Sequence, residues 1–483
     1  MLELAGVTYD RRVRASMRKG LLGLTVLLSA AAVPAPTAAA TRHPSGPGCD
    51  RARPAVAHYG GGIPAPGRRR SAPVPCATFV GTTSEAASVG VTRSGSVFYA
   101  PLLENTSPPP QNTLQGPEWV VRSRDLGASW TKLDSGGPRT AGLVPPWMSV
   151  DPVTSRIWFT TTLPALCGAQ VSWSDDDGAR WHTGAGVPCP SQGGEKLLEG
   201  PPPASGAKPV GYPHVVYYCA NTIDIAPSNL WCYKSLDGGK TFAFTGAFPD
   251  PPRPPGCSER HPSRPGVAGS DGALYFPTIL CGTLGVAISR DEGATWQFRP
   301  NVASGLQDIY TTGTAADHDG DLYFAYRGPG GLPYLTTSTD HGVTWSTPTM
   351  VAAPGVRAVR RVAVAVRRRG EVGLAYAGTT DGAHFNGYIT ESRNVLARRP
   401  RFWSASVNDP SAPLINATDG ETFGDRFFYG GVAIGPDGTV WAGFHCAKAT
   451  ACPGRRVGLV GRLTRRSRFR DHARAASPRP NAG

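Results

Sequence analysis

The chain has 483 residues and contains 60 glycines, 47 prolines and 10 cysteines. It is too long for a small domain and shows no long helical periodicity in its middle, so it predicts many short strands joined by turns. The formal net charge is +14, but residues 77–463 hold 32 basic and 31 acidic side chains. The excess charge lies in the two ends, which argues against a nucleic-acid-binding domain.

The first 40 residues predict an export signal. Arg18 and Lys19 form a basic start, residues 21–32 form a short apolar run, and residues 38–40 are three alanines typical of a cleavage site. Met17 directly precedes this pattern, so we expect translation to start there. No second apolar run is long enough to span a membrane. The pattern predicts a secreted, extracellular protein.

Two basic segments flank the predicted folded domain. Residues 41–76 predict a disordered linker, and residues 464–483 predict a disordered tail, because both are basic and lack regular apolar patterning. Residues 77–463 predict a single domain.

A repeated octapeptide dominates that domain. Its pattern is S-x-D-x-G-x-[ST]-[WF], and Arg180 is the only departure from it. Successive copies start 51, 61, 54 and 49 residues apart, a period that fits one four-stranded blade of a β-propeller. The copies are residues 123–130, 174–181, 235–242, 289–296 and 338–345.

The residue types of the octapeptide predict a tight turn. Serine and aspartate side chains can bond nearby backbone amides, and glycine adopts a positive φ without steric cost. The closing aromatic residue begins the next strand and can be buried between neighbouring blades.

Seven strand–turn–strand units set the predicted number of blades. Five precede an octapeptide, the sixth precedes a degenerate copy at residues 388–394, and the seventh is followed only by the apolar segment 457–463. We therefore predict an all-β propeller of seven four-stranded blades, with six blades as the alternative. The seven units lie near residues 91–99, 148–160, 211–218, 266–276, 313–326, 362–376 and 430–444.

Strand direction predicts where the long insertions lie. Strands alternate within a blade, so the 1–2 and 3–4 loops share one face, and the octapeptides are 3–4 loops. The proline-rich insertions are predicted in 2–3 or 4–1 positions, on the opposite face around the central channel, where function is usually found. They are residues 101–117, 182–212, 245–265 and 401–429.

The octapeptide resembles the Asp box, or bacterial neuraminidase repeat, of sialidase-like β-propellers. Asp boxes are structural elements, so the resemblance implies the fold and not a catalytic role for the repeated aspartates. Sialidases hold the substrate carboxylate with arginines and use a Tyr–Glu nucleophile pair and an Asp acid/base. Their early R-I-P motif is absent from this sequence.

One late segment is similar to the place of the sialidase nucleophile. Residues 424–433 precede a strand pair near the end of the domain. The resemblance implies Tyr429, Glu421 and Asp425 as catalytic residues; alternatively, Asp425 and Arg426 form an ion pair and Tyr429 packs the last blade. The side chains predicted to bind the substrate from the same face are Arg260, His261, Arg264, Arg327 and Arg426.

Other charged residues are predicted on that face. Asp381 and His384 are expected in a 2–3 loop, and Glu195 and Glu199 in a 4–1 loop. The aspartates at 317, 319 and 321 have the spacing of a calcium loop, but the glycine and glutamate that complete such a loop are missing. We predict a turn there, and no metal or cofactor.

Ten cysteines in an exported chain predict disulfides. Their clustering favours sequential pairing within or beside single blades. The predicted pairs are Cys49–Cys76, Cys167–Cys189, Cys219–Cys232, Cys257–Cys281 and Cys446–Cys452.

Three functions fit these features. The first is a secreted sialidase-like glycoside hydrolase that acts on glycans. The second is a non-catalytic propeller that binds a glycan or a protein through its insertion-rich face. The third is a polysaccharide lyase that uses His261 or Tyr429 as a base. We expect a monomer whose partner is a glycan or another cell-surface polymer, and we expect no nucleic-acid partner.

Overall fold

The computed structural model describes the chain between residues 53 and 465, with gaps, and all statements below concern that part. The described residues are 53–67, 71–84, 87–101, 103–104, 114–116, 119–135, 140–141, 147–162, 168–188, 193–221, 230–248, 260–262, 266–306, 312–417, 431–447, 452 and 457–465. They belong to the unit formed by residues 40–483.

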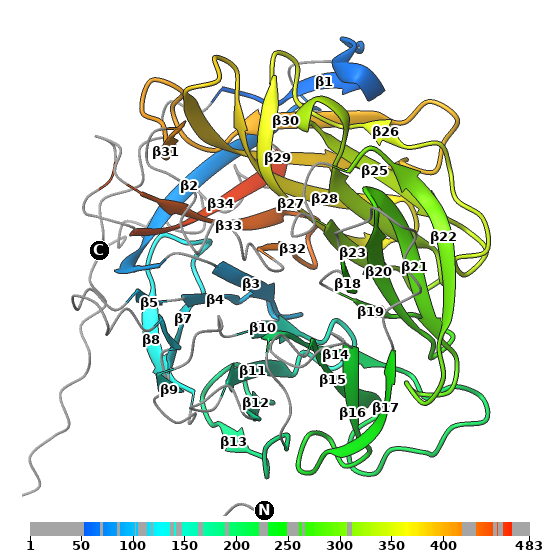
Figure 1. Cartoon of the computed structure of the whole chain (residues 1–483). Helices are drawn as coiled ribbons and strands as arrows, with labels where there is room; N and C mark the ends of the chain where they lie inside the picture. Colours follow the sequence, from blue (N-terminus) through cyan, green and yellow to red (C-terminus); the bar gives the residue numbers. More distant parts are fainter. Residues whose placement is uncertain are drawn as a thin grey trace, which may run out of the picture. The chain divides into compact units, whose positions relative to one another are not determined.

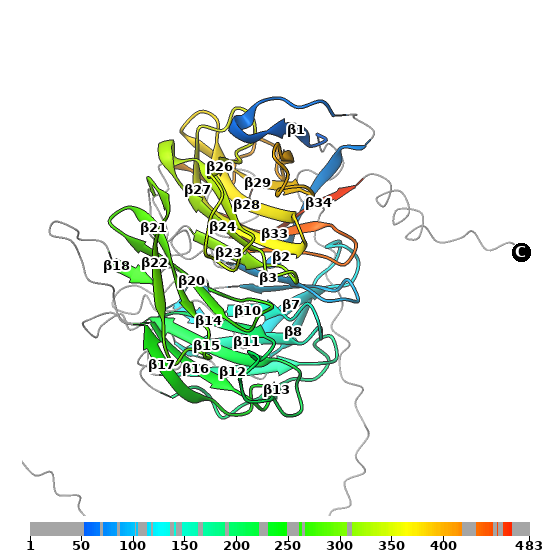
Figure 2. The same cartoon turned by 90° about the vertical axis from the view of Figure 1, so that its right-hand side faces the viewer.

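Seven antiparallel sheets follow one another along the chain (Figures 1 and 2). Each has four strands in sequence order from the innermost outward, apart from the additions described below. The prediction of an all-β propeller with seven blades is confirmed, and the alternative of six blades is wrong. The innermost strands of six blades line a common channel.

The first three blades follow the simple pattern. Blade I consists of β3 (Ala87–Val91), β4 (Val97–Pro101), β7 (Trp119–Ser123) and β8 (Thr131–Asp134). Blade II consists of β10 (Trp147–Val150), β11 (Ile157–Thr162), β12 (Ala169–Ser174) and β13 (His182–Thr183). Blade III consists of β14 (Gly193–Gly200), β15 (Val215–Asn221), β16 (Leu230–Ser235) and β17 (Ala243–Phe248).

Blade IV divides its first strand between two short segments. It consists of β18 (Arg260–Pro262) and β19 (Val267–Ala268), followed by β20 (Leu274–Leu280), β21 (Thr283–Ser289) and β22 (Gln297–Ser304). Blade V consists of β23 (Thr312–Ala316), β24 (Leu322–Arg327), β25 (Pro333–Ser338) and β26 (Thr349–Met350).

Strands from the amino-terminal side complete the last two blades. Blade VI consists of β27 (Ala358–Arg368), β28 (Glu371–Thr379), β29 (His384–Ser392), β30 (Arg401–Ser406) and, outermost, β1 (Val56–Tyr59). Blade VII consists of β32 (Val432–Ile434), β33 (Val440–Cys446), β34 (Val457–Arg465) and, outermost, β2 (Pro73–Thr83).

Minor elements decorate this ring. A small separate sheet contains β5 (Leu103–Glu104), β6 (Leu114–Gly116) and β9 (Thr140–Ala141), and β31 (Ile415–Asn416) pairs with β29. Two 3-10 turns are η1 (Gly60–Gly62) and η4 (Pro329–Gly331).

The pairing of β2 with β34 closes the ring, and Figure 1 shows the blue β2 beside the red β34. The pairing runs from Pro73–Arg465 to Thr83–Val457. It supplies the fourth strand that the sequence did not reveal for the seventh unit, and it covers a sheet edge that would otherwise expose unpaired backbone groups.

Part of the predicted linker is therefore ordered. Residues 56–59 pair with β30 of blade VI, and residues 73–76 begin β2. The physical reason is that two blades offer free strand edges to this basic, proline-rich segment, and edge strands tolerate proline.

All five octapeptides form the same turn. In the third copy, the Ser235 hydroxyl accepts a bond from the Gly239 amide at 2.8 Å and donates to Asp237 Oδ1 at 2.7 Å. Thr241 donates its amide and its hydroxyl to the two oxygens of Asp237. In the second copy, Arg180 Nε donates to Asp176 Oδ2 at 2.7 Å. This bond explains how the departure from the pattern is tolerated.

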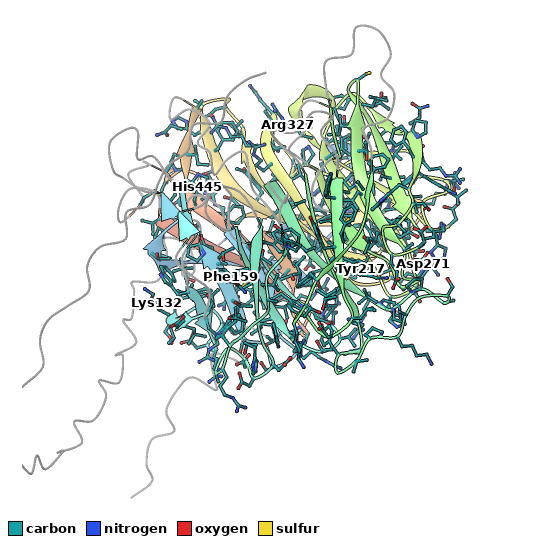
Figure 3. All side chains as sticks on the ribbon, turned by 60° about the horizontal axis from the view of Figure 1, so that its bottom comes forward. Lys132, Phe159, Tyr217, Asp271, Arg327 and His445 are labelled. Carbon is teal, nitrogen blue, oxygen red and sulfur yellow. A yellow bond between two sulfur atoms is a disulfide. The ribbon has the colours of Figure 1, made fainter. Side chains whose placement is uncertain are left out.

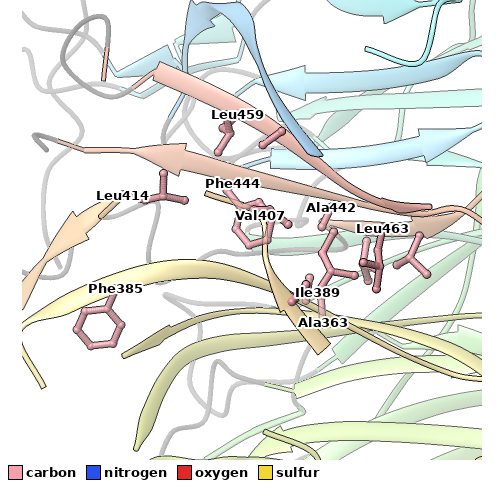
Figure 4. Close-up of a cluster of buried hydrophobic side chains, with 14 of the residues drawn as sticks. Ala363, Phe385, Ile389, Val407, Leu414, Ala442, Phe444, Leu459 and Leu463 are labelled. Atoms are coloured by element: carbon pink, nitrogen blue, oxygen red, sulfur yellow. The ribbon is translucent and has the colours of Figure 1, made fainter. Parts of the chain in front are cut away.

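Apolar side chains fill the spaces between blades. Figure 4 shows the cluster between blades VI and VII, where Ile389, Val407, Ala442, Phe444 and Leu463 meet. All five are at least 96% buried. At the junction of blades VII and I, Trp130 of the first octapeptide packs with Trp441 and Val460. The predicted burial of the closing aromatic residue is confirmed for this copy, whereas Trp181, Phe242, Trp296 and Trp345 of the other four copies are half-buried.

One predicted first strand is wrong. The unit expected near 211–218 begins instead with β14, and residues 201–214 form the 1–2 loop of blade III. This loop lies on the octapeptide face, because the Val210 amide donates to Leu236 O of the third octapeptide. The insertion at 182–212 therefore does not lie wholly on the opposite face.

Disulfides staple the propeller. Cys219–Cys232 and Cys446–Cys452 form as predicted, and the first bridges directly paired residues of β15 and β16. Cys76 and Cys281 are disulfide-bonded too, with partners outside the described residues. Cys49, Cys167, Cys189 and Cys257 also lie outside them. No helix in the described segments has the length and apolarity needed to cross a bilayer.

Candidate functional site

The two faces of the ring carry different loops. β21 ends at Ser289, where the fourth octapeptide begins, and it starts at Thr283 on the opposite face. Seven extended residues separate these ends by about 20 Å. We call the face of Thr283 the mouth face and the face of the octapeptide turns the turn face.

The structure places only some of the predicted site residues. Tyr429, Glu421, Asp425, Arg426 and Arg264 lie outside the described residues. Arg260 and His261 form part of β18, paired with Leu280 and Ile279 at the mouth end of β20.

Arg327 is the predicted substrate-binding residue whose side chain is described. It ends β24 at the mouth face and is half-buried, and its Nε has no hydrogen-bond partner among the described residues. Figure 3 shows the labelled Arg327 near the top of the view, above Lys132 and Asp271.

Asp381 and His384 bind each other. Asp381 lies in the 2–3 loop of blade VI, as predicted, whereas His384 is the first residue of β29, and His384 Nδ1 is 2.6 Å from Asp381 Oδ2. The His384 side chain, followed by backbone amides of the same loop, lowers the pKa of Asp381. This pair is exposed and satisfied within its own loop.

Glu199 lies elsewhere than predicted. It is part of β14, not of a loop, and so is Glu195. Asp151 accepts bonds from the Tyr212 hydroxyl and from the Val153 amide, and His214 Nδ1 lies 2.9 Å from it. Burial, followed by the charge of Asp151, raises the pKa of Glu199 well above its ordinary value. These residues join blades II and III, so Glu199 is not part of the mouth.

The central channel is apolar. Its cavity of about 280 Å³ is lined mostly by valine, alanine, glycine and isoleucine of the innermost strands, together with Trp147 and Met148, and Ser149 and Thr314 are the polar side chains among the described lining residues. None of the described residues that line it is charged. The channel wall therefore offers little to a sugar, whose hydroxyl groups need hydrogen-bonding partners.

A buried arginine and a half-buried one lie together between blades VI and VII. Arg361 is 5% exposed at a bulge in β27, and the Arg360 guanidinium lies 4.3 Å from the Phe385 ring centre. Both arginines and His445 line a cavity of about 20 Å³. That volume suits one water molecule and not a sugar ring.

A larger cavity opens between blades IV and V. It measures about 380 Å³, within the usual range for small-molecule sites. Tyr326 and Tyr334 are stacked in it, with ring centres 5.8 Å apart and planes inclined by 23°. Tyr326 is 1% exposed, and Tyr334 is half-buried. The remaining lining residues are Thr283, Asn301, Ala303, Ser304, Pro329 and Pro348.

Two backbone features build this cavity. The register of β22 shifts between Leu284–Ala303 and Val286–Arg299, and Asn301 in the resulting bulge has a φ of 63°. Such a bulge redirects a side chain, here to the cavity. A Cβ on Gly328 would lie 2.7 Å from the Tyr334 ring and 2.9 Å from the Tyr326 ring, so only glycine lets the loop after β24 reach the tyrosine pair.

This cavity was not predicted from the sequence. Tyr326 and Tyr334 lie in strands whose sequences look ordinary. The adjacent blade VI has an equivalent stacked pair, Tyr376 and Tyr388, with ring centres 5.5 Å apart. Tyr388, however, is only 8% exposed. The prolines on either side of this strand, Pro329 before Tyr334 and Pro348 after it, are the signal that distinguishes this blade in the sequence.

Comparisons with known proteins add little. No family model matches the chain, and no curated protein matches it. Among solved structures, it is similar to the Hadza microbial sialidase Hz136, with 16% identity, a TM-score of 0.41 and coverage of 69% of this chain and 68% of that chain. The NanB sialidase from Streptococcus pneumoniae has 14% identity, a TM-score of 0.40 and coverage of 80% and 70%.

A fungal lectin, the Aleuria aurantia lectin, is described as a six-bladed β-propeller. It has 11% identity, a TM-score of 0.39 and coverage of 69% of this chain and 98% of that chain. Likenesses at these scores carry no argument about the function of this chain.

Proposed function

We propose that this protein is an exported propeller that binds a glycan in the cavity between blades IV and V. One observation carries the proposal: a half-buried tyrosine, backed by a buried one, faces a cavity that also presents Asn301, Thr283 and Ser304. A pyranose ring has an apolar C–H face that packs on an aromatic ring, and it has hydroxyls that need donors and acceptors. An asparagine amide supplies both.

The chemistry of the lining suits binding more than catalysis. None of the described lining residues is a carboxylate, a histidine or a cysteine, the groups that usually transfer protons or attack a substrate. The buried Tyr326 hydroxyl resists ionisation, because burial, followed by the neighbouring Tyr334, raises its pKa.

A glycan array followed by calorimetry tests this proposal. Tyr334→Ala should weaken binding of the best glycan at least about 10-fold, because it removes the stacking surface. Phe244→Ala is the control, since Phe244 is 52% exposed on the outer strand of blade III and does not line the cavity. Equal losses in the two variants, or no glycan bound at all, would refute the proposal.

Glycoside hydrolysis is the second candidate, and the half-buried Arg327 at the mouth face favours it. Here Tyr429 is the nucleophile, with Glu421 as its partner and Asp425 as acid/base. The arginines at 260, 264, 327 and 426, with His261, would hold the substrate. Release of a fluorescent aglycone from sialosides and neutral glycosides should then vanish in Tyr429→Phe. An unchanged rate in that variant would exclude this assignment.

A further inference from the structure

The turn face changes character at blade VI. Each of the five octapeptide turns carries a carboxylate, at positions 125, 176, 237, 291 and 340. The matching turn of blade VI, between β29 and β30, has Asn394 in place of the aspartate, although Ser392 still contacts it at 3.3 Å. Arginines surround this turn at 393, 398, 399 and 401. Blade VI has therefore replaced the acidic group of the other turns with basic ones.

The neighbouring turn of the same blade extends this basic surface. Arg368 and Arg369 lie at the turn between β27 and β28. We call the six exposed side chains the arginine stripe; they are Arg368, Arg369, Arg393, Arg398, Arg399 and Arg401. The stripe crosses the turn face of blade VI from its innermost strand to its outer edge. Across five strands this distance is about 20 Å.

Most of the stripe is not neutralised. Arg369 pairs with Asp321 at 2.8 Å, and Arg393 lies 3.7 Å from Glu371. In the described part of the chain, the other four arginines have no carboxylate within 4.0 Å. Residues 357–401 hold ten arginines against three acidic side chains, whereas the whole predicted domain is almost neutral. The positive potential is therefore concentrated on one blade.

Aromatic rings hold the outer arginines in place. The Arg399 guanidinium lies 3.8 Å from the ring centre of Tyr59, which the amino-terminal strand β1 brings to the edge of blade VI. Arg401 lies 5.8 Å from the Trp403 ring. These contacts fix the guanidinium groups before a ligand arrives, so less side-chain entropy is lost on binding.

We infer that the arginine stripe binds a linear acidic polysaccharide. Guanidinium groups bind carboxylates and sulfates through paired hydrogen bonds, and a row about 20 Å long matches an extended chain of several sugar units. This site lies on the face opposite the proposed cavity, and it does not depend on a glycan being bound there.

The same residues disfavour other polyanions. Proteins that bind single-stranded nucleic acids stack bases on exposed aromatic rings, but the Tyr59 and Trp403 rings of this surface are covered by arginines. A membrane surface would call for several exposed apolar side chains beside the basic ones, and Ile63, in the turn after β1, is the one large exposed hydrophobic residue next to the stripe among the described residues.

Binding of a polygalacturonate oligomer to the full chain, measured by calorimetry between about 50 and 300 mM salt, tests the inference. Substituting Arg398→Gln, Arg399→Gln and Arg401→Gln together should weaken binding at least about 10-fold at low salt. It should also reduce the slope of log K against log salt by roughly two to three, about one for each arginine removed. Tyr334→Ala should leave this binding unchanged, which separates this site from the proposed cavity.

The control removes the same charge elsewhere, with Arg53→Gln, Arg299→Gln and Arg357→Gln, which are exposed outside the stripe. Equal weakening in the control would mean that net charge alone binds the polymer, and no weakening in the stripe variant would place the site elsewhere. Tighter binding of single-stranded DNA of equal charge would identify a nucleic acid as the partner. Each of these results overturns the inference. If the triple variant unfolds, Arg398→Gln alone, which breaks no described bond, should still weaken binding measurably.

Discussion

Replacing the first serine of each octapeptide by alanine tests the reasoning about the turns. The serines are 123, 174, 235, 289 and 338, and each is at most 1% exposed. In every copy the serine hydroxyl accepts a bond from the glycine amide four residues later, at 2.8 or 2.9 Å. The same hydroxyl donates to the aspartate at 2.7 to 3.0 Å.

The magnitude follows from what each substitution leaves unpaired. The glycine amide is buried and has no other described acceptor, so it loses its partner at a cost of about 1–3 kcal/mol. The aspartate keeps its bonds from the residue four positions after it and is accessible to water, so losing the bond from the serine hydroxyl costs it little. We expect each of the five variants to lower the free energy of unfolding by about 2 kcal/mol.

Blade VI offers a matched control. Ser392 is also 1% exposed, but it contacts only Asn394, at 3.3 Å through both the amide and the side chain, and no glycine amide donates to it. Ser392→Ala should therefore cost about 0.5–1 kcal/mol. Urea denaturation of all six variants, compared at a common m value, measures these differences. A loss at Ser392 as large as at the other five, or losses near zero at most of the five, would refute the assigned role of the glycine amide.

Two further predictions concern the blade interfaces. Glu199→Gln should raise the stability of the protein near neutral pH and change it little below about pH 4. The reason is that the pKa of Glu199 is raised in the folded state, so the carboxyl group contributes its full stability below the ordinary glutamate pKa and loses it as pH rises. Denaturation midpoints at both pH values measure this, and equal shifts at both would contradict it. Phe79→Ala in β2 should lower the free energy of unfolding by about 3–5 kcal/mol, since Phe79 is 7% exposed in the core of the closing blade. Thermal unfolding measures this loss, and a value below about 1 kcal/mol would show that β2 contributes little to the stability of the ring.

Local chemistry made the blades predictable from sequence. An octapeptide such as residues 235–242 contains all the donors and acceptors of its own turn, so the pattern predicts the turn without knowledge of the rest of the fold. The inner strand β14 was missed for the opposite reason. Its charged residues resemble a loop, and only the contact with blade II explains why Glu199 belongs in a strand.

Long-range pairing and register were beyond the sequence. β2 carries no mark of its partner β34, because the pairing depends on which edge remains free when the ring is complete. The proposed cavity depends on a bulge that turns Asn301, and a two-residue shift of register between β21 and β22 leaves no composition signal. The catalytic assignment of Tyr429 stays a prediction.

Closing the last blade with β2 has a consequence for how the chain reaches its native state. The segment that must pair with Pro73–Thr83 is Val457–Arg465, so nearly the whole polypeptide has to be synthesised before the ring can close. β2 can pair only after β34 has been made, so the entropic cost of closing this long loop falls in a single late step. A ring that closes late is compatible with export of an unfolded chain, the route that the predicted signal peptide implies.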